Sequence, residues 1–169
     1  TQEDFPIIAE LLTLGQAEAQ PTNRNQRDEA RQKIIVADTD PDSLRATSLS
    51  LVKAGFEVLS FQTPAEVMAA IKTERPDLFI LDVKLPAIDG HNLSRSIRKV
   101  PALAFTPMVY TTSRSEMDEK GSGLRYGTDH YILKPYEPEE LIVQVSSYLA
   151  RIKFLRDLTI RDGLTQAYN

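Results

Sequence analysis

Residues 78–90 read Leu-Phe-Ile-Leu-Asp-Val-Lys-Leu-Pro-Ala-Ile-Asp-Gly. The first four are apolar, which is typical of a strand buried on both faces of a parallel sheet. The run ends at Asp82, and Pro86 and then Asp89-Gly90 predict a loop followed by the start of a helix. Carboxylates at the carboxyl ends of such strands lie where open α/β sheets bind ligands. Asp82 is therefore a candidate for chemistry, although a strand can also end on a polar residue that has no function.

A short apolar run, a polar turn and a helical pattern recur five times from Lys33 onward. This alternation predicts an α/β fold, a flavodoxin-like doubly wound sheet of five parallel strands in the order 2-1-3-4-5, with five helices of which the last is extended. The strands are expected at 33–37, 56–60, 78–82, 107–111 and 129–133. The helices are expected at 42–54, 64–74, 90–99, 115–126 and from 137 onward.

Two of these helices differ from the others. Segment 115–126 contains Gly121 and Gly123, each of which costs about 1 kcal/mol relative to alanine inside a helix, so this helix should be the least stable. The last helix, from Glu137 to about Ile160, would be roughly 36 Å long, which exceeds the domain edge that it must cover. Its second half is therefore expected to have no sheet to pack on.

The composition is globular, with 41% hydrophobic and 26% charged residues. A net charge of −4 gives no electrostatic reason to expect nucleic acid or an anionic membrane as a partner. The chain has no cysteine, which excludes disulfides, cysteine-based zinc sites and a cysteine nucleophile, and its two histidines, His91 and His130, form no ligand cluster in the sequence. No membrane span or signal peptide is visible, so a cytoplasmic location is expected.

The chain divides into three predicted regions. Residues 1–32 hold a short helical pattern and a polar linker, and we expect them to belong to a preceding region. Residues 33–150 are expected to form the α/β domain. Residues 151–169 extend the last helix toward a further domain.

Polar side chains follow four of the predicted strands, at the edge where parallel strands end. They are Asp38, Asp82, Thr112 and Lys134. Neighbouring strands lie about 4.8 Å apart, so the two aspartates can share one site. Two such carboxylates repel each other unless a cation such as Mg²⁺ is present, and a lysine and a hydroxyl supply what phosphoryl oxygens need. Each residue alone has an ordinary structural explanation, but together they predict a phosphoryl-transfer site with a carboxylate as acceptor.

Residues 33–150 resemble the receiver domain of two-component response regulators. Four segments carry the resemblance, and they are 33–40, 81–90, 110–113 and 127–135. They are similar to the family's first strand with its acidic pocket, its phosphoacceptor segment, its switch strand and its lysine loop. The resemblance implies a signalling domain rather than an enzyme, with a sensor histidine kinase or a phosphotransfer protein as its partner.

The resemblance assigns roles at the site. It implies that Asp82 accepts the phosphoryl group and that Lys134 contacts that group. It also implies that Asp38, Asp82 and the backbone carbonyl of Lys84 hold Mg²⁺.

Two switch residues are implied as well. Thr112 would move toward the phosphoryl group, and Tyr131 would change rotamer with it. The resemblance further implies a cis peptide bond between Lys134 and Pro135.

One position departs from the family pattern. The acidic pair after the first strand is normally two carboxylates, of which the second ligates the metal, and here that place is Thr39. Asp40 should point the other way by alternation, so we expect weaker Mg²⁺ binding and slower phosphorylation. The alternative is a pseudo-receiver that acts as an interaction and dimerisation module and is not phosphorylated. Lys84, two residues after Asp82, faces the site by alternation and could change dephosphorylation in either direction.

The last residues suggest an output. Ile152, Leu155 and Leu158 continue the apolar spacing of the last helix, which predicts a coiled-coil seam and a homodimer. Residues 162–169 resemble the Asp-x-Leu-Thr-Gly-Leu-x-Asn opening of GGDEF (diguanylate cyclase) domains, with Gln166-Ala167 departing from it. This resemblance implies a parent protein that makes cyclic di-GMP, although the cyclase signature itself is absent from the chain.

A different class stays open. Asp38 and Asp40 after a hydrophobic strand also resemble the nucleophile motif of haloacid-dehalogenase-type phosphohydrolases, with Asp38 as nucleophile and Asp40 as general acid/base. Against this, Asp42 stands where Thr or Val is expected, and segment 82–90 would have no role. The receiver is the favoured interpretation.

Overall fold

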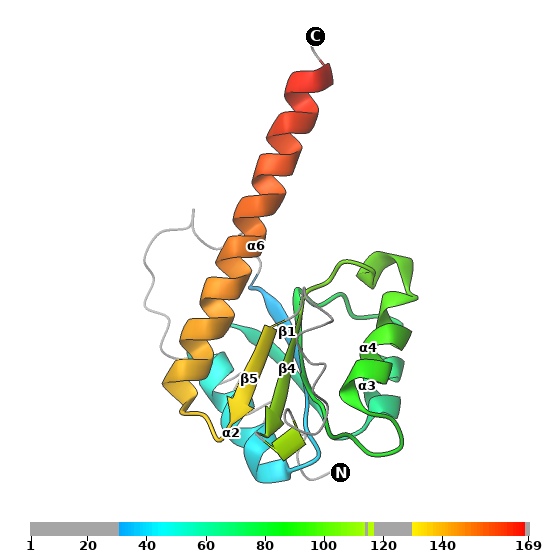
Figure 1. The fold of residues 1–169 in the computed structure, drawn as a ribbon, viewed down its shortest axis with the longest axis vertical. Coiled ribbons are helices and arrows are strands. Elements are labelled where there is room, and N and C mark those ends of the chain that lie inside the picture. The colour runs from blue at the N-terminus through cyan, green and yellow to red at the C-terminus, as the bar shows by residue number, and fades with distance from the viewer. Residues whose placement is uncertain (1–30, 114, 117–129, 168–169) are drawn as a thin grey trace, which may run out of the picture. The chain divides into compact units, whose positions relative to one another are not determined.

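The structure is a computed structural model that describes residues 31–113, 115–116 and 130–167, with side chains described as far as residue 161. Within these ranges, Figure 1 shows a parallel sheet with helices on both sides. Most of the predicted region 1–32, the predicted helix 115–126 beyond its first two residues, and residues 168–169 lie outside the described residues.

Five parallel strands form one sheet in the order β2-β1-β3-β4-β5, which confirms the predicted strand order. They are β1 (Lys33–Ala37), β2 (Glu57–Phe61), β3 (Leu78–Asp82), β4 (Met108–Ser113) and β5 (His130–Lys134). β1 and β3 have the predicted bounds, and β2 and β4 begin one residue later than predicted. For β2 the reason is that the Phe56 amide donates to the Leu51 carbonyl in the preceding turn, at 3.1 Å, and so does not join the sheet. The predicted start of the fifth strand at residue 129 lies outside the described residues.

Four of the five predicted helices fall largely within the described residues, and all four are present. They are α2 (Pro41–Lys53), α3 (Pro64–Ala70), α4 (Gly90–Arg98) and α6 (Pro138–Ala167), and a 3-10 turn, η1 (Pro101–Leu103), was not predicted. α3 is shorter than the predicted 64–74. Its end is fixed by Arg75, whose guanidinium donates to the Ile71 carbonyl at 2.6 Å, just before Pro76.

Side-chain caps set where the helices begin. The Asp40 carboxylate accepts from the Asp42 amide at 3.0 Å and caps α2, so Asp40 serves the helix. Thr63 and Glu66 form a reciprocal capping box at α3. Asp89 accepts from the Asn92 amide at 2.8 Å and caps α4. These caps place the first turns of α2 and α4 at the carboxyl edge of the sheet.

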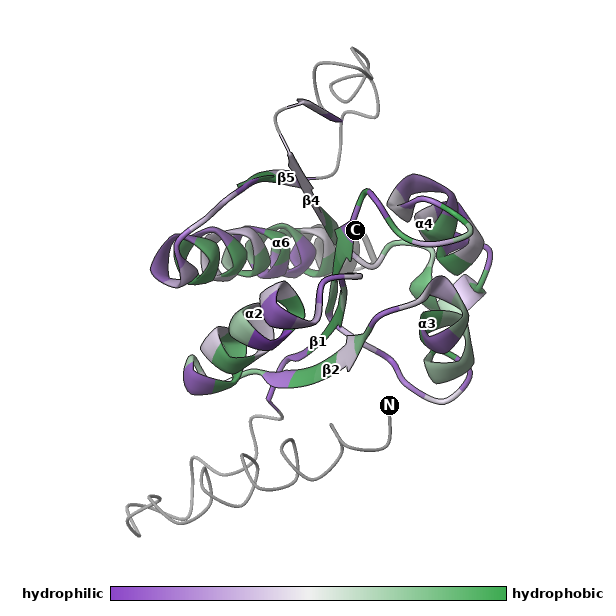
Figure 2. Cartoon of the chain, turned by 90° about the horizontal axis from the view of Figure 1, so that it is seen from below, coloured by the Kyte–Doolittle hydropathy of each residue, from purple (hydrophilic) through white to green (hydrophobic). Residues whose placement is uncertain are grey.

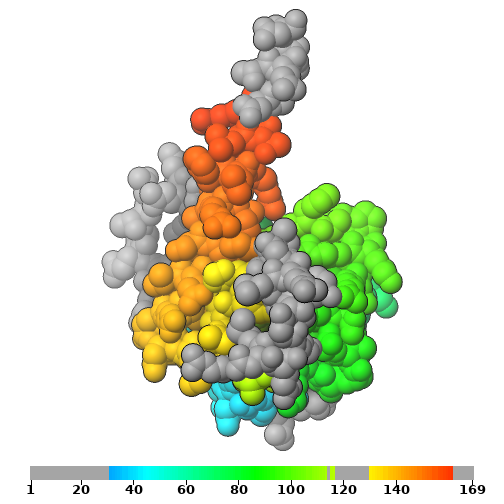
Figure 3. All heavy atoms as spheres, viewed as in Figure 1, coloured from blue at the N-terminus to red at the C-terminus, as the bar shows by residue number. Residues whose placement is uncertain are grey.

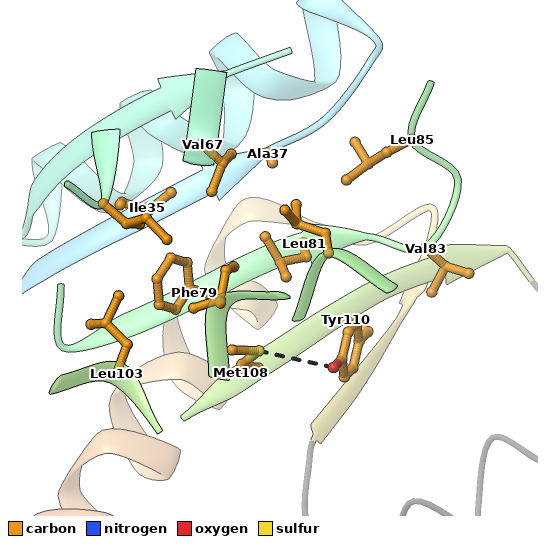
Figure 4. Packing of buried hydrophobic residues seen from close by; sticks show 13 residues of the cluster. Ile35, Ala37, Val67, Phe79, Leu81, Val83, Leu85, Leu103, Met108 and Tyr110 are labelled. Carbon is orange, nitrogen blue, oxygen red and sulfur yellow. Dashed lines mark hydrogen bonds between the residues drawn. The ribbon is translucent and has the colours of Figure 1, made fainter. Parts of the chain in front are cut away.

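The sheet is buried on both faces, as the apolar run of β3 predicts. α2 and α6 pack on one face and α3 and α4 on the other, with their apolar sides turned inward (Figure 2). In Figure 4, Phe79 and Leu81 of β3 lie between Ile35 and Met108, and the Tyr110 hydroxyl lies 3.9 Å from the Met108 sulfur. The central strands therefore hold the carboxyl edge on a rigid support.

The last helix, α6, changes character along its length. Leu141, Val145 and Leu149 are buried against the sheet, as expected. Farther along, α6 extends past the rest of the described domain (Figures 1 and 3), and Leu155 and Leu158 are 53% and 41% exposed. Phe154 and Ile160, at 62% and 59%, are exposed as well. These four exposed apolar side chains agree with the expectation that the second half of α6 has no sheet to pack on.

Candidate functional site

Strand register brings the predicted residues to one edge. Ala37 pairs with Leu81, so Asp38 and Asp82 leave adjacent strands side by side. On the far side, Asp82 pairs with Thr111, and Ser113 pairs with Lys134.

Lys134 connects the two carboxylates. Its ammonium Nζ donates to Asp38 Oδ2 and to Asp82 Oδ2, each at 2.8 Å. The two aspartates are 4% and 7% exposed, so water screens their attraction to the ammonium less than it screens a surface ion pair. The Lys134-Pro135 peptide bond is cis, which confirms that prediction.

The aspartates differ in their remaining partners. Asp38 Oδ1 accepts from the Asp40 amide at 3.0 Å, and Oδ2 accepts from the Ser43 hydroxyl at 2.8 Å. Asp82 Oδ1 accepts from the Lys84 amide at 3.0 Å. Ser43, on the first turn of α2, was missed by sequence reasoning because its contact depends on how that helix meets β1.

This difference sets opposite pKa directions. Burial raises the pKa of Asp38, but the hydrogen bonds from Lys134, Asp40 and Ser43 outweigh it, and the pKa lies below its ordinary value. Burial also raises the pKa of Asp82, and there the donations from Lys134 and Lys84 do not cancel it, so this pKa lies above its ordinary value. Burial lowers the pKa of Lys134, and its bonds to both carboxylates reverse that and raise it. The site therefore holds a firmly ionised Asp38 and a more basic Asp82.

The oxygen donors around the two aspartates fit Mg²⁺ in part. Asp38, Asp82 and the Lys84 carbonyl are hard oxygen ligands of the type that Mg²⁺ takes together with several waters. Thr39 supplies no third carboxylate, and its hydroxyl donates to the same Lys84 carbonyl at 3.3 Å. In the described ranges, no group of three or more acidic or histidine side chains forms a metal cluster. The donor set is thus one charge poorer than a three-carboxylate site.

The two predicted switch residues have partners that the sequence did not indicate. The Thr112 hydroxyl donates to Glu116 Oε2 at 3.0 Å, and the same carboxylate oxygen accepts from the Ser113 amide at 3.0 Å. Partial burial raises the pKa of Glu116, but these donors outweigh it and lower the value. The Tyr131 hydroxyl is hydrogen-bonded to His91 Nε2 at 2.8 Å.

The loop between Asp82 and α4 is tightly shaped. Ala87 has a positive φ of 69°, with the Ile88 amide donating to the Pro86 carbonyl at 2.8 Å, which is a strained γ-turn. Gly90 lies against the backbone of Asp82, because a Cβ added there would collide with the Asp82 carbonyl oxygen. The predicted helix start at Asp89-Gly90 is present, and it is packed directly behind the candidate acceptor.

A family model described as the response regulator receiver domain matches residues 34–146. The chain belongs to the response regulator receiver family. This receiver domain is a signalling domain rather than an enzyme, and the match decides against the phosphohydrolase interpretation.

Three known proteins illustrate the relationship. The receiver chain is 35% identical over 135 residues to the transcriptional regulatory protein GltR of Pseudomonas aeruginosa, covering 80% of this chain and 54% of GltR. It is 32% identical over 124 residues to the DNA-binding response regulator MtrA of Mycolicibacterium smegmatis, covering 73% of this chain and 53% of MtrA. The structure of the chemotaxis response regulator CheY4 of Vibrio cholerae superposes with a TM-score of 0.63 at 24% identity, covering 71% of this chain and 99% of CheY4, and shows the shared fold.

The receiver chain spans about half the length of the curated relatives that it matches. Their names do not point to the GGDEF output that residues 162–169 suggested. Of that segment, residues 162–167 continue α6 as helix. No helix among the described residues is both long enough and apolar enough to cross a membrane.

Proposed function

We propose that this receiver takes a phosphoryl group from a sensor histidine kinase or a phosphotransfer protein onto Asp82. The observation that carries the proposal is the Asp38–Lys134–Asp82 arrangement. Asp82 is the more basic carboxylate of the two. The Lys134 ammonium, which now donates to Asp82, can donate to a phosphoryl oxygen once Asp82 carries the phosphoryl group. In this step the nitrogen–phosphorus bond of a phosphohistidine breaks as an Asp82 carboxylate oxygen bonds to phosphorus.

The cation site belongs to the same proposal. Asp38, Asp82 and the Lys84 carbonyl would hold Mg²⁺, with Thr39 as a neutral neighbour. When bound, the ion would neutralise phosphoryl charge. Asp38 is kept ionised by Ser43 and by the Asp40 amide, and it is thereby ready to serve as a ligand.

The switch is proposed to consist of Thr112 and Tyr131. A phosphoryl group on Asp82 would compete with Glu116 for the Thr112 hydroxyl, which now donates at 3.0 Å to that carboxylate. Movement of Thr112 on β4 would then be passed to its neighbour strand β5, which carries Tyr131.

A cavity beside the site supports docking of a phosphodonor protein. It has a volume of about 440 Å³ and is bordered by Ala46 and Thr47 of α2 and by the segment Lys134–Tyr136. Because Lys134 belongs both to this cavity and to the carboxylate pair, a partner seated here would bring its phosphohistidine close to Asp82. A cytoplasmic location goes with this proposal.

The deciding experiment is intact-mass measurement after incubation with acetyl phosphate and Mg²⁺. Wild type is expected to gain about 80 Da, the mass of one phosphoryl group, in a form labile to hydroxylamine. Asp82→Asn should gain nothing, whereas Asp42→Asn, a control at an exposed carboxylate, should gain as wild type does. An adduct that persists in Asp82→Asn would reject Asp82 as the acceptor.

A pseudo-receiver is the second candidate, and it is favoured by the hydroxyl of Thr39. This hydroxyl stands where a carboxylate is expected, and it donates a hydrogen bond to the Lys84 carbonyl that would otherwise be available to the metal. If wild type gains no mass and also fails to bind berylliofluoride, the pseudo-receiver becomes the better description.

We propose residues 33–150 as the receiver and 151–169 as the connection to an output. Residues 162–169 favour a GGDEF output, and we expect a parent protein that continues beyond Asn169 to convert GTP into cyclic di-GMP. The names of the relatives favour a DNA-binding output instead. Assays of cyclic di-GMP synthesis and of DNA binding by that parent protein distinguish the two outputs. Only a DNA-binding output would give the whole protein a nucleic-acid partner.

A second copy of the chain is the proposed partner of the exposed half of α6. Leu155 and Leu158 are three residues apart and both exposed, as the seam of a two-stranded coiled coil requires. The homodimer would set two receivers side by side ahead of their outputs.

A further inference from the structure

Tyr131 is tied to α4 by a hydrogen bond that has no role in the proposed function. The bond joins its hydroxyl to Nε2 of His91, at 2.8 Å, and His91 is the second residue of α4. Tyr110 lies beside both rings, with centroids 4.5 Å from His91 and 5.2 Å from Tyr131 in stacked arrangements. Tyr110 and Tyr131 are also register partners on β4 and β5, so their side chains share one face of the sheet.

Further hydrogen bonds hold this cluster in place. The Tyr110 hydroxyl donates to Ser94 Oγ at 2.7 Å, and the Ser94 hydroxyl donates to the His91 carbonyl at 2.7 Å. Tyr110 and Ser94 are buried, which makes these bonds difficult to break without a substitute partner. His91 is therefore fixed through its backbone as well as its ring.

The cluster also reaches the candidate acceptor. Gly90, next to His91, has no room for a Cβ because it packs on the Asp82 carbonyl, and its amide donates to the Val83 carbonyl at 2.9 Å. The first turn of α4, which carries the His91 ring, is therefore packed directly on the backbone at Asp82. The path runs separately from the Lys134 ion pair, which contacts the Asp82 side chain.

We propose that His91 is a positioning residue that holds Tyr131 in its inward rotamer against Tyr110. Through this bond, the first turn of α4 and the loop behind Asp82 bias the side-chain orientation on β5. The inference rests on the proposed function where it treats Tyr131 as a switch. The bond and its effect on the Tyr131 rotamer do not depend on phosphorylation.

The test compares variants that remove the bond from either end. His91→Phe keeps a ring to stack on Tyr110, and Tyr131→Phe removes only the hydroxyl, so both preserve most of the packing. His130→Phe is the matched control. His130 lies on β5, next to Tyr131, and it makes a similar hydrogen bond to Gln144 at 2.9 Å and stacks on Tyr148 of α6. Rotamer populations of tyrosine are measured by NMR on the unphosphorylated chain, with the Tyr131 signal assigned from its loss in Tyr131→Phe.

His91→Phe is expected to shift the inward-to-outward ratio of Tyr131 by about threefold to tenfold, the range for loss of one hydrogen bond. His130→Phe should leave that ratio unchanged. An unchanged ratio in His91→Phe, or an equal change in both variants, would overturn the proposal.

A second measurement separates this inference from the proposed function. Rates of phosphorylation by acetyl phosphate should change by the same factor in His91→Phe and Tyr131→Phe, and the double variant should change no further. Additive effects would contradict a shared bond. If wild type takes no phosphoryl group, the proposed function fails, while the rotamer measurement still decides the role of His91.

Discussion

Asp38 and Asp82 share one ammonium, yet folding affects their ionisation in opposite directions. Asp38 accepts from Lys134, Ser43 and the Asp40 amide, whereas Asp82 has Lys134 and the Lys84 amide. The additional donor keeps Asp38 ionised, as a cation ligand should be. Asp82 keeps more of its basicity, and a more basic carboxylate is a better nucleophile toward phosphorus.

Asp82→Asn should stabilise the domain at neutral pH. In wild type the native state binds a proton on Asp82 more tightly than the unfolded chain does, because the native pKa is raised above 3.8. Wild type therefore loses stability as the pH rises from 3.8 through the native pKa, and the variant lacks this loss. Urea unfolding from pH 4 to pH 7 should show a stability difference that grows with pH and then levels off. A difference that stays constant across this range would contradict the assignment.

Thr39→Asp should strengthen Mg²⁺ binding by about tenfold, a change of about 1.4 kcal/mol, because it adds a carboxylate and removes the donor from the Lys84 carbonyl. NMR titration with Mg²⁺ measures the affinity. Thr39→Asn is the control, since it has the size of aspartate without the charge and should leave the affinity near that of wild type. Equal affinities in wild type and Thr39→Asp would show that the missing charge does not limit the site.

At the scale of elements, the two halves of α6 have different roles. Its first half completes the core with Leu141, Val145 and Leu149. Its second half keeps apolar side chains that cover nothing in the described domain, and a helix of this kind is stable when a neighbour buries it. With 30 residues, α6 is about 45 Å long, enough to carry a signal away from the sheet.

Replacing both Leu155 and Leu158 by Asp should convert a homodimer into a monomer. Two buried aspartates per chain would lack partners in the seam, and their desolvation opposes pairing. Ile160→Asp is the matched control, because Ile160 is similarly exposed but lies about 140° around the helix from Leu155. Sedimentation velocity across a range of concentrations distinguishes these outcomes. A wild-type chain that is monomeric at every concentration would contradict the proposed coiled-coil seam.

Secondary structure was predictable to within a residue or two wherever apolar runs and caps coincide. β1 and β3 are bounded as predicted, because in each a run of four apolar residues leads directly to an aspartate, Asp38 just after β1 and Asp82 as the last residue of β3. The predicted 64–74 helix was too long, since the Arg75 guanidinium that ends α3 is a side-chain contact that periodicity does not encode. The turn η1 was missed because three residues are too few to show a period.

Over the whole molecule, the sheet order was predictable and so was the edge at which the polar residues gather. Parallel strands all end at one edge, so residues directly after a strand are placed by topology alone. Ser43, His91 and Glu116 could not be predicted, because their contacts depend on how helices and loops meet that edge. The edge where the strands begin holds a different charge cluster. There the Lys33 ammonium Nζ lies 2.6 Å from Glu74 Oε2, and the Lys33 backbone amide donates a hydrogen bond to the Asp77 carboxylate.

The placement of Lys134 has a consequence for synthesis on the ribosome. Lys134 is 52 residues later than Asp82, on the edge strand that pairs last with β4. While the chain is being made, from its N-terminus onward, β1 and β3 can come together before the shared ammonium exists. A nascent domain at that stage has two facing carboxylates without their cation and an open β4 edge, and β5 resolves both at once. A chain terminated before residue 134 would thus carry the acceptor side chain and lack the site.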